Sequence, residues 1–88
     1  MESKHYFFVI LEDKKYDIIH CHQRSKETVA FGLANLEGAW AMAEVKAKKL
    51  ATGSSTSPII ETIPEEIVQL FFPHSKRQRA WVVSEKSS

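Results

Sequence analysis

The sequence predicts an α+β fold in which a small, mostly antiparallel sheet of about five strands packs against one main α-helix. Three observations support this fold class: an apolar run at 6–11, apolar residues at helical spacing over 35–51, and polar turns between further short apolar segments. The chain has 88 residues, the size of one domain. We therefore expect 1–88 to form a single domain, with frayed ends at 1–4 and 84–88.

The first part of the chain has the pattern of three strands joined by short polar turns. Residues 6–11 are apolar at every position, which is typical of a central strand that is covered on both faces. Residues 12–15 have the length of a hairpin turn, and 16–23 suit a second strand. A third strand is predicted over 28–33, where Gly32 indicates a bulge or a close approach of the backbone.

The main helix is predicted over 35–51. Asn35 suits the N-cap, lysines occupy the last turns, where cations are favourable, and Gly53 is placed to end the helix. Trp40 would supply most of the buried area. The expected buried stripe consists of Leu36, Trp40, Ala43, Ala47 and Leu50, with Ala39 beside them.

The last third of the chain is predicted to hold two more strands, at 59–63 and 80–83. The segment 64–72 between them fits either a short helix or a strand. The helix is favoured because Pro64 at the first helical position, followed by two acids, suits the start of a helix. Residues 73–79 are predicted to form a polar, basic loop.

Composition and motifs argue against several classes of function. The net charge is +1, which is not typical of a protein that binds nucleic acid over its whole surface. Neither a phosphate-binding loop nor a nucleophile motif occurs, so we expect no enzyme activity and no cofactor. Cys21 is the only cysteine, and no secretory signal is visible, which favours a reducing, cytoplasmic location. No apolar run approaches the ~20 residues that span a bilayer, so we expect no membrane contact.

The triplet at 20–22 is the nearest approach to a metal site. On a strand, His20 and His22 point to one face and Cys21 to the other. Joined by His5 or an acid, the two histidines could hold zinc for a small metal-dependent enzyme, but their spacing secures only two ligands where a site needs three or four. The favoured interpretation is an exposed strand face with two ordinary histidines and a buried thiol, without a metal.

The strand order predicts charges of opposite sign at the two ends of the molecule. The end with the 12–15 turn would be acidic, and the other, with the 24–27 turn, the helix C-terminus and the 73–79 loop, would be basic. The acids are Glu12, Asp13, Asp17, Glu37, Glu65 and Glu66, against Lys14 and Lys15. The predicted binding surface at the basic end comprises Arg24, Lys26, Lys46, Lys48, Lys49, Lys76, Arg77 and Arg79, with Trp81 beside them.

Two charged ends without catalytic chemistry favour a small, non-enzymatic module that binds another protein. The size and layout resemble small phage-encoded inhibitors of host machinery, such as anti-CRISPR proteins and inhibitors of RNA polymerase. That resemblance implies an inhibitor that binds a host protein, and it transfers no site residue.

The alternative is a nucleic-acid-binding protein, in which the basic end contacts phosphates and Trp81 stacks on a base. A homodimer is compatible with either function, because a small sheet can leave an edge open for a second copy.

Overall fold

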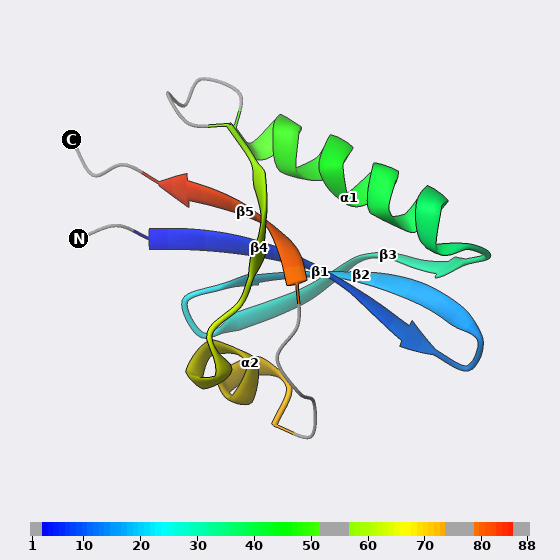
Figure 1. Cartoon of the computed structure of the whole chain (residues 1–88), viewed down its shortest axis with the longest axis horizontal. Helices are drawn as coiled ribbons and strands as arrows, with labels where there is room; N and C mark the ends of the chain where they lie inside the picture. The colour runs from blue at the N-terminus through cyan, green and yellow to red at the C-terminus, as the bar shows by residue number, and fades with distance from the viewer. Residues whose placement is uncertain (1–2, 52–56, 74–78, 86–88) are drawn as a thin grey trace.

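The computed structural model describes residues 3–51, 57–73 and 79–85, and these form the predicted α+β fold (Figure 1). The main helix and the helical form of the segment after Pro64 are both confirmed. The elements in chain order are β1 (Ser3–Glu12), β2 (Lys15–His22), β3 (Ser25–Leu33), α1 (Leu36–Ala51), β4 (Ile59–Thr62), α2 (Glu65–Phe71) and β5 (Arg79–Glu85).

The strands form one antiparallel sheet in the order β3-β2-β1-β5-β4. β5 comes last in the chain but lies between β1 and β4, so β1 is central and β3 and β4 are the edges. The pairing of β1 with β5 extends from Phe8 to Ser3, into the ranges expected to fray. Residues 1–2 and 86–88 lie outside the described residues.

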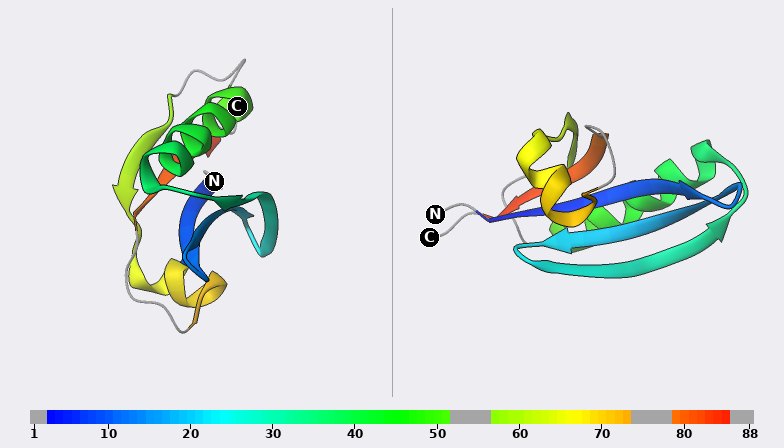
Figure 2. Two further views of the ribbon diagram at one scale, coloured as in Figure 1. Left: turned by 90° about the vertical axis from the view of Figure 1, so that its right-hand side faces the viewer. Right: turned by 90° about the horizontal axis from the view of Figure 1, so that it is seen from below.

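The two helices cover opposite faces of this sheet, here named the α1 face and the α2 face (Figure 2). Consecutive residues of β1 point to opposite sides, so Phe7 packs on the α1 face and Phe8 on the α2 face. The α2 face also buries Cys21, Ile63 and Val68. The apolar run at 6–11 is therefore the central strand that its composition predicted.

The buried stripe of α1 differs from the prediction. Its buried residues are alanines at every fourth position, while Leu36 and Leu50 are 53% and 40% exposed and Trp40 lies at the margin. Alanine has the smallest apolar side chain, so the helix backbone can approach the sheet closely on this face. The buried residues are Ala39, Ala43, Ala47 and Ala51.

Both helices begin where their sequences predict. Asn35 caps α1, because its Oδ1 accepts the Gly38 N–H at 2.7 Å. Pro64 stands just before α2 rather than at its first position, and its carbonyl accepts the N–H groups of Ile67 and Val68. The predicted stop at Gly53 lies outside the described residues. Neither helix in the described ranges is long and apolar enough to cross a bilayer.

A two-residue turn joins β1 to β2. Glu12 pairs with Lys15, and the residues between them, Asp13 and Lys14, have φ angles of 51° and 62°. Positive φ at both positions is the geometry of a type I′ turn, whose twist matches that of the flanking strands. The second position favours glycine, so Lys14 holds its conformation at a cost in free energy.

We predict that Lys14→Gly raises the free energy of unfolding by about 1 kcal/mol, because glycine adopts positive φ without steric strain. Urea unfolding followed by circular dichroism measures the change. Lys15→Gly is the matched control: it lies in β2, so it should lower stability. A Lys14→Gly variant less stable than the parent would contradict this interpretation of the turn.

We predict that Ala43→Leu lowers the free energy of unfolding by about 1–3 kcal/mol, because a larger side chain cannot fit between α1 and the sheet. Ala41→Leu makes the same change at an exposed position of the same helix and should cost about 0.5 kcal/mol or less. Thermal unfolding of both variants checks this. Equal losses of stability in the two variants would show that the buried alanines do not limit the distance between α1 and the sheet.

Candidate functional site

A bulge in β3 decides which of its side chains reaches solvent. Asp17 of β2 faces two residues of β3, Phe31 and Gly32, where the pairing register shifts. Gly32 has φ 71°, and its N–H donates to Asp17 Oδ1 at 3.1 Å. The irregularity predicted at Gly32 is therefore a bulge, and beside it the Phe31 side chain is 78% exposed.

Carboxylates surround this exposed ring. They lie at the end of the sheet that holds the β1–β2 turn, here named the hairpin end, away from α2 (Figure 1). Carboxylates outnumber ammonium groups there, so the surface combines an apolar centre with an anionic border. We name it the Phe31 surface, and it consists of Glu12, Asp13, Lys15, Asp17, Phe31 and Gly32, which line one shallow depression.

The predicted acidic end is formed only in part. Glu12, Asp13 and Asp17 meet as expected, on the Phe31 surface. Glu65, however, begins α2, and the strand before that helix ends at Thr62, which pairs with the first residue of β5. The prediction failed for Glu65 and its neighbour because α2 packs onto a face of the sheet and does not start from the hairpin end.

The predicted basic end is formed only in part: the C-terminal part of α1 lies at the same end of the sheet as the β2–β3 turn, but the cations there are on different faces (Figure 1). Arg24 occupies the turn between β2 and β3 and is exposed. Lys26 lies on the α2 face: its Nζ donates to the Phe71 carbonyl at 3.1 Å and lies 5.0 Å from the Phe72 ring centroid. Three other cations, Lys46, Lys48 and Lys49, belong to α1 on the opposite face. The sheet therefore separates Lys26 from the α1 lysines.

Arg79 also lies away from Arg24. The next residue, Ala80, is level with Phe8 and Ile19, which puts Arg79 about 17 Å along the sheet from the turn that holds Arg24. The prediction assumed that 64–72 would run down the sheet and leave the following loop at its far end. Lys76 and Arg77 lie outside the described residues, and a binding role for any of these cations stays a prediction.

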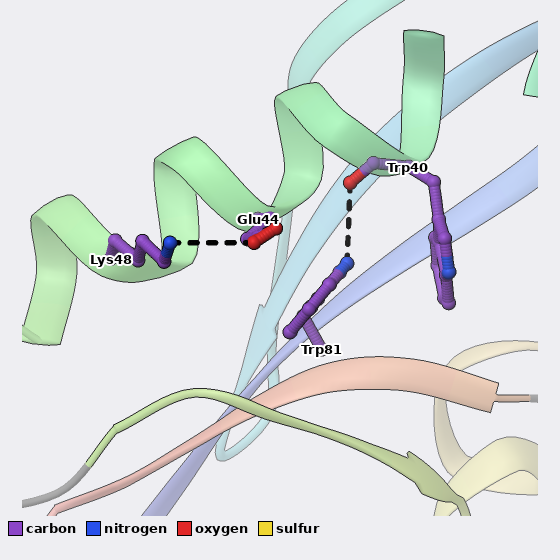
Figure 3. A network of polar contacts seen from close by, with 4 residues as sticks. All are labelled: Trp40, Glu44, Lys48 and Trp81. Carbon is purple, nitrogen blue, oxygen red and sulfur yellow. Dashed lines mark hydrogen bonds and ion pairs between the residues drawn. The ribbon is translucent and has the colours of Figure 1, made fainter. Parts of the chain in front are cut away.

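Trp81 lies beneath α1, as Figure 3 shows. Its indole Nε1–H donates to the Trp40 carbonyl at 3.2 Å, and the two indole rings are 6.0 Å apart at an angle of 49°. Both tryptophans are partly buried. From the sequence, Trp40 was expected in the core and Trp81 beside a basic loop. Their contact was not predicted, because it joins a helix to the last strand of the chain.

Three histidines gather on the α1 face, where β1 pairs with β2. His5 stands opposite His22 and joins the pair that the sequence singled out. Its Nδ1 lies 2.9 Å from His20 Nε2, and its ring stacks on that of His22 with centroids 3.7 Å apart. His5 is buried, and the other two are partly buried, so the face is less exposed than predicted.

Stacking explains why this cluster is a poor metal site. Ring nitrogens offer their lone pairs in the plane of the ring, and the His5 ring is within 13° and 19° of parallel to the other two. Three lone pairs then do not converge on one point, as zinc requires. Across the described ranges, no group of three or more histidine, cysteine, aspartate or glutamate side chains is arranged to hold a metal ion.

Cys21 is fully buried on the α2 face, as predicted, and forms no disulfide. Burial raises the pKa of its thiol to about 12, although nearby Lys26 lowers it slightly. Because the thiolate is the reactive form, the Cys21 side chain is a poor nucleophile and metal ligand. It acts in packing.

Comparisons with known proteins identify no relative of this chain: no protein-family model, curated protein or solved structure matches it. The function is therefore inferred from its own geometry.

We predict that stability falls on acidification, in a way that depends on His20. Burial lowers the pKa of His20 below its usual 6.5, the charges of His5 and His22 lower it further, and Glu27 opposes them. Below pH 6.5 the unfolded chain then binds a proton more readily than the folded one. The contribution of His20 to the free energy of unfolding is complete above pH 6.5 and is lost as the pH falls towards the folded-state pKa of His20.

Urea unfolding between pH 7.5 and pH 5 tests this, at intervals of about half a pH unit. His20→Gln should flatten the pH dependence. Glu27→Gln removes the charge that raises the pKa of His20, so it should steepen the loss of stability. An unchanged profile in His20→Gln would assign the acid sensitivity to other groups.

Proposed function

We propose that this protein is a non-enzymatic binding module that contacts a basic protein partner through the Phe31 surface. The observation that carries the proposal is a large aromatic side chain, 78% exposed and bordered by Glu12, Asp13 and Asp17. Aromatic residues are enriched among the few that dominate the energy of protein interfaces. The carboxylates would attract a cationic partner and speed its association.

Phe31 is held in place before any partner binds. The Gly32 N–H that bonds to Asp17 fixes the bulge beside it, so little backbone freedom remains to be lost on binding. Burying a phenylalanine side chain stabilises a complex by about 1.5–3 kcal/mol. An apolar pocket flanked by lysine or arginine on the partner is the chemistry that fits this surface.

Recognition through side chains suits this edge of the sheet better than addition of a strand. β3 is an edge strand, but its register shifts twice where it pairs with β2, near Asp17 and again between Ile18 and Ile19. Bulges bend an edge and interrupt the regular row of backbone groups that an added strand would need. Pairing of two copies along β3 is accordingly not part of the proposal.

The cytoplasm is the location that we propose, because the lone cysteine, Cys21, is a free thiol that a reducing compartment preserves. Inhibition of a host protein is a narrower form of the same proposal. It rests on the size and layout of the domain.

Nucleic acid is the alternative ligand, through the lysines near the end of α1. Lys46, Lys48 and Lys49 share the last turns of that helix, and they would contact phosphates without reading sequence. This alternative is weaker because Lys26 and Arg79 do not join them.

We predict that Phe31→Ser weakens binding of the partner about 10- to 100-fold, which corresponds to loss of one buried phenylalanine. Affinity capture from cells of the source organism, followed by mass spectrometry and titration of the retained protein, measures it. Val45→Ser is the matched control, because Val45 is 52% exposed on α1. Replacing Glu12 and Asp13 by their amides should slow association, and added salt should mimic that effect.

Two results would contradict the proposal. One is a retained protein that binds Phe31→Ser as tightly as the parent. The other is capture of DNA or RNA with an affinity that falls steeply as salt rises, which would favour the α1 lysines.

A further inference from the structure

The two tryptophans of the chain, Trp40 and Trp81, meet at the edge of the helix–sheet interface. One comes from α1 and the other from β5, and Figure 3 shows both rings below the helix. The hydrogen bond from the Trp81 indole to the Trp40 carbonyl fixes the second ring against the helix. Two indoles are therefore held in a fixed relative orientation, with an angle of 49° between their planes.

A pocket of about 270 Å³ opens beside these rings. Ligand pockets for whole drug-sized molecules begin at roughly 300 Å³, so this one fits a head group. Its lining follows the helical repeat: Glu37 and Glu44 are two turns apart on one side of α1, with Trp40 between them. Ala41 has a short side chain that leaves the opening free.

We propose that this pocket binds an alkylated ammonium group, either quaternary or a methylated amine. The faces of indole rings carry negative potential, and a cation within about 6 Å of a ring centroid is attracted to them. Because the two centroids are 6.0 Å apart, one cation can lie within that range of both. The carboxylates of Glu37 and Glu44 add charge attraction at the border of the pocket.

The chain itself already places a cation at this border. Lys48 Nζ lies 3.4 Å from a Glu44 carboxylate oxygen, across one turn of α1 (Figure 3). The Lys48 side chain is 66% exposed, and an exposed ion pair contributes little to stability, so an incoming cation can displace it at low cost. A methylated ammonium is less strongly hydrated than the lysine head group, so it suits the indole walls better.

This site is independent of the Phe31 surface. Trp81 packs against the α1-face cluster and Trp40 contacts Trp81, whereas Phe31 lies at the hairpin end among different carboxylates. Loss of partner binding by Phe31→Ser would leave the tryptophan site unaffected, and the reverse also holds.

Intrinsic fluorescence tests the proposal directly, because both tryptophans of the chain line the pocket and no other residue gives the same signal. Choline chloride is the probe, and 3,3-dimethyl-1-butanol, which has the same shape without the charge, is its control. We expect a saturable fluorescence change with choline and none with the alcohol. The proposal is overturned if both compounds give the same change, or if neither choline nor a peptide that carries trimethyllysine gives one.

Variants distinguish attraction of choline by the pocket residues from an effect of the overall charge of the protein. Glu44→Gln should weaken choline binding about 2- to 5-fold, and Trp40→Leu by at least as much, with Trp81 still reporting. Glu66→Gln removes the same charge from α2 and should leave the affinity unchanged. Equal effects of Glu44→Gln and Glu66→Gln would overturn the proposal.

The source of the ammonium group is resolved by a second probe, a short peptide that carries trimethyllysine, compared with the same peptide carrying lysine. Binding of choline alone supports a small-molecule ligand. Preferential binding of the trimethylated peptide supports a modified protein as the ligand. A peptide that binds equally well with and without methyl groups, in the absence of choline binding, would overturn the assignment.

Discussion

Phe7 and Phe8 bury their rings on opposite faces of β1, and the rest of the fold depends on covering both of them. They are only 3% and 0% exposed. Because neighbouring residues of a strand point to opposite sides, two consecutive aromatic residues require a packed layer on each face of the sheet. α1 supplies one layer and α2 with Ile63 the other, while β2 and β5 pair with the two sides of β1.

Small residues control the two surfaces that we connect with function. Along α1 the alanines occupy the buried stripe, which leaves Trp40 at the margin, beside Trp81 of β5. In β3 the bulge at Gly32 leaves Phe31 in solvent beside Asp17. On α1 the small side chains allow a close approach to the sheet, whereas in β3 the glycine allows the positive φ of the bulge. In both places an aromatic ring beside the small residue stays accessible.

The position of β5 explains why the charges are distributed differently from the prediction. If each new strand paired with the strand before it in the chain, the basic segments would all lie at one end of the sheet. Instead α2 packs on a face and β5 inserts beside β1, so Arg79 starts near the middle of the sheet. Lys26 folds over α2, away from the lysines of α1. Long-range pairing, rather than local sequence, decided this distribution.

The fold class, the cap at Asn35 and an irregularity at Gly32 could be predicted from the sequence, because hydrophobic period, capping and positive φ are properties of a few adjacent residues. Which side of α1 is buried and where β5 inserts depend instead on tertiary packing. The same holds for the meeting of Trp40 with Trp81, and of His5 with the histidines of β2. Each of these joins residues distant in the chain, and contacts of that kind depend on packing that no local pattern encodes.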